Sequence, residues 1–285
     1  MRFDNLFVMG QHLAPQHGLS RAAGMLANSK VAAIKNPFIN WFIKQYNVNM
    51  AEAEFPNAED YADFNTFFTR ALKPGVRPID PSENTLVSPV DGTISQIGRV
   101  EKGKLFQAKG QDFSLIDLLG GSMERAKPFV DGEFTTIYLS PKDYHRIHMP
   151  EAATLREMVH VPGRLFSVNP VTTEKVSALF ARNERVVCIF DTAFGPMAMI
   201  LVGAMIVASI ETSWAGLVAP SRRRVKAVQY GEDLNIRFAR GDEMGRFKLG
   251  STVVLVTPPK TTEWLDHLKA GSALRMGEPI ANLQG

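Results

Sequence analysis

The sequence predicts an α+β fold, in which an antiparallel, β-rich, sandwich-like core follows a set of N-terminal amphipathic helices. From Thr85 onward, short apolar runs alternate with turn dipeptides such as Asp91-Gly92 and Pro162-Gly163. Few stretches of helical length separate these runs, which favours consecutive antiparallel strands over a doubly wound α/β fold. Upstream, between Leu19 and Met50, apolar residues recur at helical spacing. A chain of 285 residues, 45% of them hydrophobic, is long enough to bury a large core.

The predicted strands are short, apolar and rich in β-branched residues. They include residues 93–98, 134–140, 153–161, 185–192, 197–202, 204–210 and 251–256. The uncharged run Thr192–Ile210 has about the length of a membrane span. Gly195-Pro196 and Gly203 divide it into pieces of strand length, so we predict two buried strands there instead. Cys188, the single cysteine, is predicted to be a small buried residue in a strand.

The region from Leu19 to Met50 combines aromatic and basic residues. They are Phe38, Trp41, Phe42, Lys30, Lys35 and Lys44. Such helices can lie in the plane of a membrane interface, with the aromatic side down and the lysines toward the headgroups. Packing of the same face on the core of the protein is the alternative. The pattern predicts a helical region at residues 1–56 and a β-rich domain at residues 57–285.

A further helix is predicted to begin at Asn57 as its N-cap. Glu59 and Asp60 would occupy the first turn, where the helix dipole favours acidic residues. An apolar stripe would then dock this helix on the core. Its members are Tyr61, Phe64, Phe68 and Leu72.

The charge balance is mildly basic. The net charge is +3 and the isoelectric point is near 8.9, which suits an anionic partner such as a lipid headgroup. No nucleic-acid-binding motif accompanies the charge, so we expect no nucleic-acid partner. The first ten residues lack the apolar core of a signal peptide, and no cleaved leader is expected.

The pair Gly250-Ser251 stands at the entrance to a β-branched run. It is not a Gly-x-Ser-x-Gly nucleophile elbow, because Leu249 and Val253 occupy the glycine positions. The Ser251 hydroxyl can attack the Gly250 carbonyl carbon through a five-membered ring, and glycine permits the strained backbone that this requires. Elimination from the resulting ester, followed by hydrolysis, would leave an N-terminal pyruvoyl group and ammonia. A general base is needed for these steps, and the dipeptide alone is equally typical of an ordinary turn.

Two histidines, His145 and His148, follow a possible helix start. Ser140 and Asp143 resemble a capping box, which predicts a short helix with both imidazoles on one face. Two neutral imidazoles suit acid–base chemistry near neutral pH, although incidental histidines on a surface helix would look the same. No metal site is expected, because no third ligand stands at a recognisable spacing.

Asp91, followed by Gly92, is a candidate carboxylate. The dipeptide first indicates a hairpin turn. Alternatively, Asp91 could orient and charge-stabilise a histidine base that deprotonates Ser251.

Longer stretches of the chain form a recognisable set. They are Phe67-Phe68-Thr69-Arg70, Arg77-Pro78-Ile79-Asp80, Val90-Asp91-Gly92, Tyr144-His145-Arg146-Ile147-His148-Met149-Pro150, Gly163-Arg164-Leu165-Phe166-Ser167-Val168-Asn169, Phe180-Ala181-Arg182-Asn183-Glu184-Arg185 and Gly245-Arg246-Phe247-Lys248-Leu249-Gly250-Ser251-Thr252. Together they resemble the bacterial-type phosphatidylserine decarboxylases over most of the chain. Ala208 departs from the glycine that relatives often carry there, which concerns strand packing rather than chemistry.

The resemblance implies a role for each candidate residue. Ser251 corresponds to the self-cleaving serine that becomes the pyruvoyl group, and Gly250 to the residue before the cut. His148 and Asp91 correspond to members of a Ser-His-Asp relay for that cleavage. His145 corresponds to a histidine implicated in decarboxylation, as the proton donor to the substrate. The cleavage would give a large chain, 1–250, and a small chain, 251–285, which form a heterodimer capable of higher assembly.

The implied reaction uses the pyruvoyl group as its cofactor, with no metal and no external cofactor. The amine of phosphatidylserine forms a Schiff base with the pyruvoyl carbonyl, CO2 leaves, and the carbanion delocalises into the imine. Protonation and hydrolysis then release phosphatidylethanolamine. The resemblance also implies that residues 1–56 are a membrane-associating helical region and residues 57–285 a catalytic β-rich domain. The expected location is the cytoplasmic face of the cell membrane, as a peripheral protein on an anionic surface.

Two other functions remain open from the sequence. An unprocessed serine hydrolase could use Ser251, His148 and Asp91 on a lipid without cutting itself. A non-catalytic lipid-binding module would share the N-terminal helices but has no need of the histidine pair and the Gly-Ser site.

Overall fold

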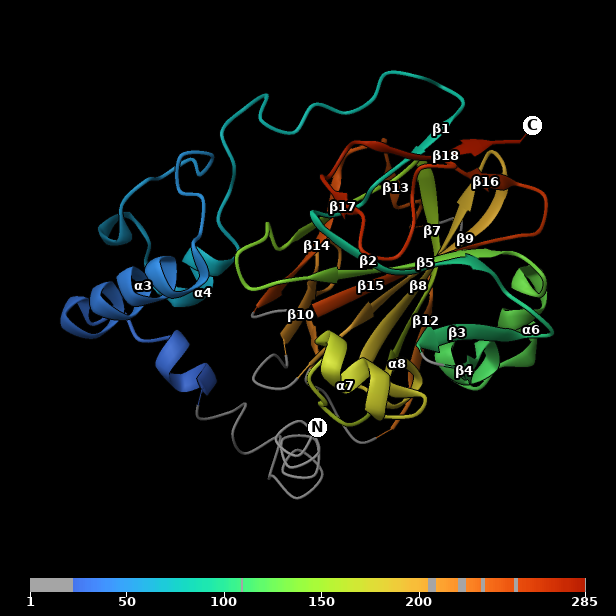
Figure 1. Cartoon of the computed structure of the whole chain (residues 1–285), viewed down its shortest axis with the longest axis horizontal. Helices are drawn as coiled ribbons and strands as arrows, with labels where there is room; N and C mark the ends of the chain where they lie inside the picture. The colour runs from blue at the N-terminus through green and yellow to red at the C-terminus, as the bar shows by residue number, and fades with distance from the viewer. Residues whose placement is uncertain are drawn as a thin grey trace.

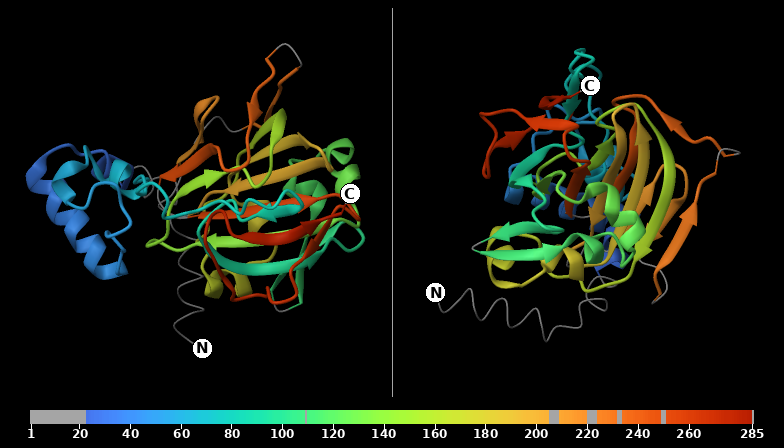
Figure 2. Two further views of the ribbon diagram at one scale, coloured as in Figure 1. Left: turned by 90° about the horizontal axis from the view of Figure 1, so that it is seen from above. Right: turned by 90° about the vertical axis from the view of Figure 1, so that its right-hand side faces the viewer.

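The computed structural model describes residues 23–108, 110–204, 209–219, 224–231, 234–248 and 251–284. An antiparallel β-rich body carries a helical unit at one end (Figure 1, Figure 2). This arrangement confirms the predicted α+β class. The predicted strands match observed ones to within two residues, except for 204–210. Residues 205–208 of that strand lie outside the described residues.

The main sheet has nine strands within the described part of the chain. Their spatial order is β12 (Lys226–Gln229), β7 (Ala153–Val161), β8 (Arg185–Thr192), β9 (Gly195–Val202), β15 (Ser251–Thr257), β5 (Glu133–Leu139), β2 (Gly92–Arg99) and β17 (Ala273–Leu274), with β13 (Arg237–Phe238) also paired to β7. Strand β15 is central, and its residues 253–256 are fully buried, alternating between the two faces of the sheet. A run of β-branched residues suits such a position. Cys188 is buried in β8 as predicted, and burial raises the pKa of its thiol.

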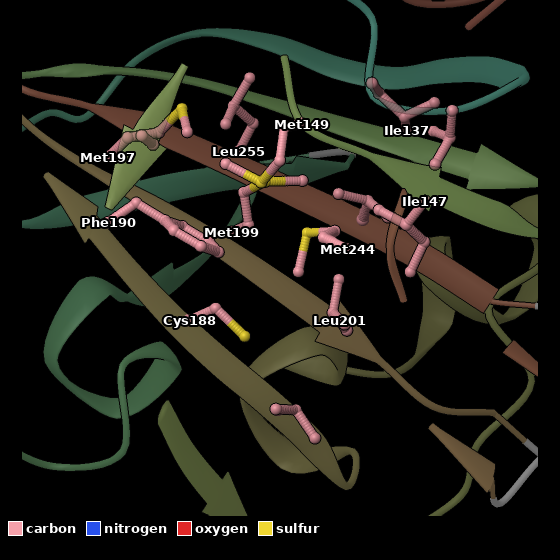
Figure 3. Close-up of a cluster of buried hydrophobic side chains, with 14 of the residues drawn as sticks. Ile137, Ile147, Met149, Cys188, Phe190, Met197, Met199, Leu201, Met244 and Leu255 are labelled. Atoms are coloured by element: carbon pink, nitrogen blue, oxygen red, sulfur yellow. The ribbon is translucent and has the colours of Figure 1, made fainter. Parts of the chain in front are cut away.

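A smaller sheet packs on one face of the main sheet. It contains β11 (Gly216–Ala219), β10 (Ser209–Thr212), β14 (Glu243–Lys248) and β6 (Arg146–His148). Ile147 of β6 and Met244 of β14 share an apolar layer with Met199 and Leu201 of β9 (Figure 3). Two sheets with an apolar layer between them make the core sandwich-like, as predicted.

The opposite face of the main sheet is covered by short elements. They are β3 (Lys104–Ala108), β4 (Gln111–Ser114), α5 (Leu115–Leu118), α6 (Met123–Ala126), η2 (Lys127–Phe129), α7 (Pro170–Lys175) and α8 (Leu179–Arg182). Val254 and Val256 of β15 face a second apolar cluster on this side. A third sheet contains β1 (Thr85–Val87), β18 (Pro279–Leu283) and β16 (Thr262–Trp264).

The helical unit has a core of its own. It comprises residues 23–27, α3 (Ala32–Tyr46), η1 (Ala58–Asp60) and α4 (Phe64–Phe68). Its apolar cluster contains Ala27, Ile39, Phe42, Val48, Ala58, Tyr61, Phe64, Phe67 and Phe68, and so includes residues on both sides of position 56. No helix in the described part of the chain is long and apolar enough to cross a bilayer.

The helix predicted to begin at Asn57 is interrupted. Asn57 does form a capping box with Asp60, but it starts only the single turn η1. Asp63 then caps α4 by accepting a hydrogen bond from the backbone N–H of Thr66 at 2.8 Å. Two N-caps within seven residues divide the predicted helix into two pieces.

Candidate active site

Three neighbouring strands of the main sheet bring the candidate residues to one end of the molecule. Thr93 at the start of β2 pairs with Tyr138 near the end of β5, and Tyr138 pairs in turn with Thr252 at the start of β15. Ser251 pairs with Leu139, the last residue of β5. Because the strands are antiparallel, the residue before β2 (Asp91), the loop after β5 and the backbone of Ser251 meet at this end.

Gly92 fixes the path of the chain beside Asp91. A Cβ atom at this position would lie 2.5 Å from the carbonyl oxygen of Tyr138, so only glycine allows β2 to approach β5 this closely. The hairpin turn that Asp91-Gly92 favoured is not present. The strands on either side of it, β1 and β2, pair with other strands, β1 with β18 and β2 with β5 and β17.

Asp91 is held by a bidentate ion pair with Arg77. The Arg77 Nε atom donates to Oδ1 at 2.8 Å, and Nη2 donates to Oδ2 at 2.6 Å. The backbone N–H of Met276 donates to Oδ1 at 2.9 Å. Arg77 also donates to Glu52 at 2.7 Å, and its hydrogen bonds to the two carboxylates raise the pKa of the guanidinium. Asp91 is therefore fixed in place by two groups, the Arg77 guanidinium and the backbone N–H of Met276.

The loop after β5 begins with a closed turn. Both the backbone N–H and the hydroxyl of Ser140 donate to Asp143 Oδ2 at 2.7 Å. Burial raises the pKa of the Asp143 carboxyl, against the opposing effect of the Ser140 hydrogen bonds. The expected hydrogen bond between these two residues is present, but the helix that it predicted is wrong, because Arg146–His148 form strand β6.

His145 is completely buried. Its Nδ1 atom lies 2.8 Å from the carbonyl oxygen of Asp143, which can only accept, so Nδ1 carries the proton. The ring centroid is 4.0 Å from that of Phe68 of α4. Burial lowers the pKa of His145 to about 3, so the imidazole is neutral. Its Nε2 atom has no hydrogen-bond partner among the described residues and presents a free lone pair.

His148 is neutral as well, but both of its ring nitrogens have partners. Nδ1 donates to the carbonyl oxygen of Gly241 at 2.7 Å, which leaves Nε2 as an acceptor 3.0 Å from the hydroxyl of Tyr144. Burial lowers the pKa of His148. The two histidines do not share one face of a helix as predicted. Positions 145 and 148 are three residues apart along an extended segment, so they are directed to opposite sides of it.

Comparison with known proteins gives a consistent result. The family model for phosphatidylserine decarboxylase matches residues 64–282, and a second model, described as PSD, matches residues 6–47. The chain belongs to the phosphatidylserine decarboxylase family. Phosphatidylserine decarboxylase proenzyme of Hahella chejuensis is 62% identical over 99% of this chain and 95% of its own. The proenzymes of Marinobacter nauticus and Bordetella avium are 60% and 58% identical, each over 98% of this chain and over 98% and 95% of their own.

The predicted resemblance and the enzyme class, a decarboxylase, are thereby confirmed. Among the candidate residues of this decarboxylase, Gly250 lies outside the described residues, and Ser251 is placed only by its backbone register. Within the described part of the chain, no three His, Cys, Asp or Glu side chains are grouped to hold a metal ion.

His148 and Asp91 lie near each other without a hydrogen bond between them. The backbone N–H of His148 donates to the carbonyl oxygen of Pro89 at 2.9 Å, two residues before Asp91. The negative charge of Asp91 acts weakly to raise the pKa of His148, against the larger effect of burial. Asp91 instead bonds Arg77 and Met276, and His148 bonds Gly241 and Tyr144. Any action of Asp91 on His148 in this arrangement is electrostatic.

Arg70 was missed as a functional candidate. It follows α4, and its side chain reaches the turn after β5, where Nη2 donates to the carbonyl oxygen of Lys142 at 2.8 Å. Burial lowers the pKa of its guanidinium. Its Nε and Nη1 atoms have no partner in the described structure, and an unpaired buried donor costs about 1–3 kcal/mol. The sequence offered only one signal, because Arg70 ends the family stretch Phe67-Phe68-Thr69-Arg70.

Proposed function

We propose that this chain converts phosphatidylserine to phosphatidylethanolamine and CO2 after cutting its own backbone between Gly250 and Ser251. One observation carries the proposal. The strand register of β5 and β15 brings the Ser251 backbone beside the turn that leads to His145, a buried neutral histidine with an unpaired Nε2 atom. A buried histidine with a free lone pair can act in catalysis, and relatives of this chain are named decarboxylase proenzymes.

Self-cleavage begins with the Ser251 hydroxyl. A base removes its proton, the oxygen attacks the Gly250 carbonyl carbon, and the peptide C–N bond breaks, giving an ester and a free amine on Ser251. Removal of the Ser251 α-proton then expels the Gly250 carboxylate from the β-carbon. The dehydroalanine that remains takes up water and loses ammonia, which leaves the pyruvoyl group on the small chain.

His148 is the proposed base for this cleavage. Burial keeps its imidazole neutral, and the hydrogen bond from Nδ1 to Gly241 leaves the basic lone pair on Nε2. The Tyr144 hydroxyl occupies that lone pair, so it must turn away before Nε2 can accept the serine proton. Asp91, with Arg77 beside it, stabilises the imidazolium through its charge rather than through a hydrogen bond.

Buried polar atoms without hydrogen-bond partners fit a bound prosthetic group and its substrate. His145 Nε2, Thr252 Oγ1 and two nitrogens of Arg70 are buried and without partners in the described structure, so a polar group and substrate could satisfy them. A pyruvoyl carbonyl supplies an electrophile for the substrate amine and an electron sink for loss of CO2.

His145 is the proposed proton donor in decarboxylation. Without substrate the His145 ring is neutral, so its Nε2 atom can at first only accept a hydrogen bond. An anionic substrate close to the ring would raise its pKa and allow it to carry a proton. Phe68 covers the ring and excludes water, which favours conversion of a charged carboxylate into neutral CO2.

The two chains formed by cleavage would remain together as a heterodimer. The small chain supplies β15 between β9 and β5, and it adds β17 beside β2 and β18 beside β1. Residues 253–256 of β15 are fully buried. Separating the chains would expose this central strand, so the cut leaves the fold intact.

Residues 1–56 are the proposed membrane-associating region, at the cytoplasmic face of the membrane, and residues 57–285 are the proposed catalytic domain. The core of the helical unit includes residues from both. Exposed apolar side chains gather in residues 25–46. They are Met25, Leu26, Val31, Ile34, Trp41 and Tyr46. Lys30 and Lys44 are exposed beside them, so both apolar insertion and attraction to anionic lipid are available.

Two of the predicted membrane-anchor residues, Phe42 and Lys35, are buried in the structure. Phe42 is 6% exposed and packs in the core of the helical unit. Lys35 is buried, and its Nζ atom donates to Asn36 and to the carbonyl oxygen of Ala58 at 3.3 Å. Trp41, which is 52% exposed, is the aromatic side chain of the three that is free to enter a membrane.

An activity assay tests the proposal. Purified wild type should release CO2 from phosphatidylserine in detergent micelles and form phosphatidylethanolamine. Ser251→Ala should run as a single chain on a denaturing gel and should release no CO2. Fatty acid or lysolipid among the wild-type products would instead indicate the serine hydrolase.

A further inference from the structure

Arg70 is a buried cation with no assigned role in the proposed cleavage or proton-transfer steps. The residue is 4% exposed, and among the described residues its side chain donates only through Nη2, to the backbone carbonyl oxygens of Lys142 at 2.8 Å and Asp143 at 3.4 Å. Nε and Nη1 have no partner among the described residues. The guanidinium of Arg125 is different, because Nε and Nη2 donate to Glu157 and Nη1 donates to Leu119.

Among the described residues, no carboxylate forms an ion pair with Arg70, although the charges of Asp91, Asp143 and Glu52 act on it. The carboxylate of Asp91 is already bound by Arg77, and that of Asp143 is bound by Ser140. His145, whose pKa the charge of Arg70 lowers, is neutral and lacks a partner at Nε2. The site therefore holds an unpaired positive charge beside a free polar nitrogen, next to the turn that follows β5. A buried arrangement of this kind is complete only with an anion.

We propose that Arg70 binds the phosphodiester group of the phosphatidylserine headgroup. This assignment rests on the proposed function and names the residue that would hold its substrate. A phosphate keeps its charge throughout the reaction, so an ion pair with Arg70 would hold substrate and transition state equally. The carboxylate loses its charge as CO2 departs, and an ion pair there would stabilise the substrate more than the transition state.

Access to Arg70 requires a small movement. The two unpaired nitrogens are covered, and the guanidinium carbon lies 5.7 Å from the ring centroid of Phe67 in α4. The aromatic side chains of α4 would shift as the phosphate enters. Replacing contact with these aromatic side chains by contact with the phosphate is favourable, because the Nε and Nη1 donors of Arg70 then gain hydrogen-bond acceptors.

Arg70→Lys and Arg70→Gln test the assignment, with Arg125→Lys as the matched control. Arg125 is also buried in an ion pair, with 11% of its side chain exposed, but it pairs with Glu157 on another element. Each protein is first checked for complete splitting on a denaturing gel. The KM for phosphatidylserine and the inhibition constant for phosphatidylethanolamine are then measured in nonionic detergent micelles. Phosphatidylethanolamine retains the phosphate but lacks the carboxylate, so its inhibition constant shows which of the two anionic groups Arg70 binds.

We expect both Arg70 variants to split fully. In Arg70→Gln, the KM and the inhibition constant should each rise about 10- to 100-fold, the range for loss of a hydrogen bond to a charged group. Arg70→Lys should fall between Arg70→Gln and wild type, and Arg125→Lys should match wild type in both constants. A higher KM with an unchanged inhibition constant would assign Arg70 to the carboxylate and overturn the proposal. Unchanged constants, or accumulation of precursor in both variants, would overturn it too. A wild type that neither splits nor decarboxylates would refute the proposed function itself.

Discussion

The hydroxyl of Tyr144 lies 3.0 Å from Nε2 of His148 and occupies the lone pair that the self-cleavage step would need. The other nitrogen of His148 donates to Gly241, so Nε2 must be the acceptor. Tyr144 is itself buried, which raises the pKa of its phenol to about 12 and keeps it protonated.

The Tyr144→Phe precursor should therefore cleave itself at least as fast as wild type, because the substitution removes the hydroxyl that competes with Ser251 for Nε2 of His148. The measurement is the loss of precursor with time in cell-free synthesis. Slower processing in Tyr144→Phe would show that the hydroxyl relays the proton instead of blocking it.

Substitutions at His145 and His148 should impair different steps, decarboxylation and self-cleavage respectively. His148→Ala and Asp91→Asn should accumulate precursor, because they remove the base and the charge that supports it. His145→Ala should still split but should turn over little or no lipid. Gel analysis and CO2 release, carried out on the same preparations, check both statements. Equal processing defects at His145 and His148 would rule out this division.

The buried histidines should make the protein sensitive to acid. The folded pKa of His145 is about 3, below its unfolded value near 6.5, and burial lowers that of His148 too. The unfolded chain binds more protons below pH 6.5, so the free energy of unfolding should fall as the pH is lowered from there. The slope is at most about 1.4 kcal/mol per pH unit for each histidine.

Urea denaturation of the Ser251→Ala precursor between pH 7 and pH 4.5 measures this slope. Adding His145→Asn should reduce it, whereas adding a substitution at the exposed His267 should not. Equal slopes for the His145→Asn protein and its parent would contradict the burial of a neutral imidazole at position 145.

Adjacent aromatic residues of α3 should respond differently to replacement by serine. Trp41→Ser should weaken binding to anionic vesicles, because Trp41 is exposed, while stability changes little. Phe42→Ser should lower the free energy of unfolding by about 3–5 kcal/mol, because Phe42 lies in the helical core. Vesicle co-sedimentation across a salt series and thermal unfolding separate the two effects. Equal sedimentation of wild type and Trp41→Ser at every salt concentration would place the membrane anchor elsewhere.

Much of the fold could be predicted from local pattern. Strand β15 consists mostly of β-branched residues, and the strands around it have turn residues at their ends, so their bounds were predicted to within two residues. The side of α3 that faces the core could not be predicted in this way. Aromatic residues occupy several faces of that helix, and only its contacts with Phe64 and Phe67 decide that Phe42 is inside and Trp41 outside.

The local structure around the candidate residues was predicted only in part. Ser140 and Asp143 bond as expected, yet pairing of Arg146 and Ile147 with β14 overrides the local preference for a helix. Arg70 could not be singled out, because a missing hydrogen-bond partner is a property of the folded surroundings and not of the local sequence.

The intact mass of the purified wild-type protein tests the central claim most directly. Self-cleavage should give two chains, one ending in a free carboxylate at Gly250 and one beginning at residue 251. The small chain should be lighter, by the mass of one ammonia, than a peptide that begins with an unmodified serine, and it should carry a ketone in place of its amine. A single uncut chain that still decarboxylates phosphatidylserine, or a small chain that keeps a free serine amine, would contradict the account.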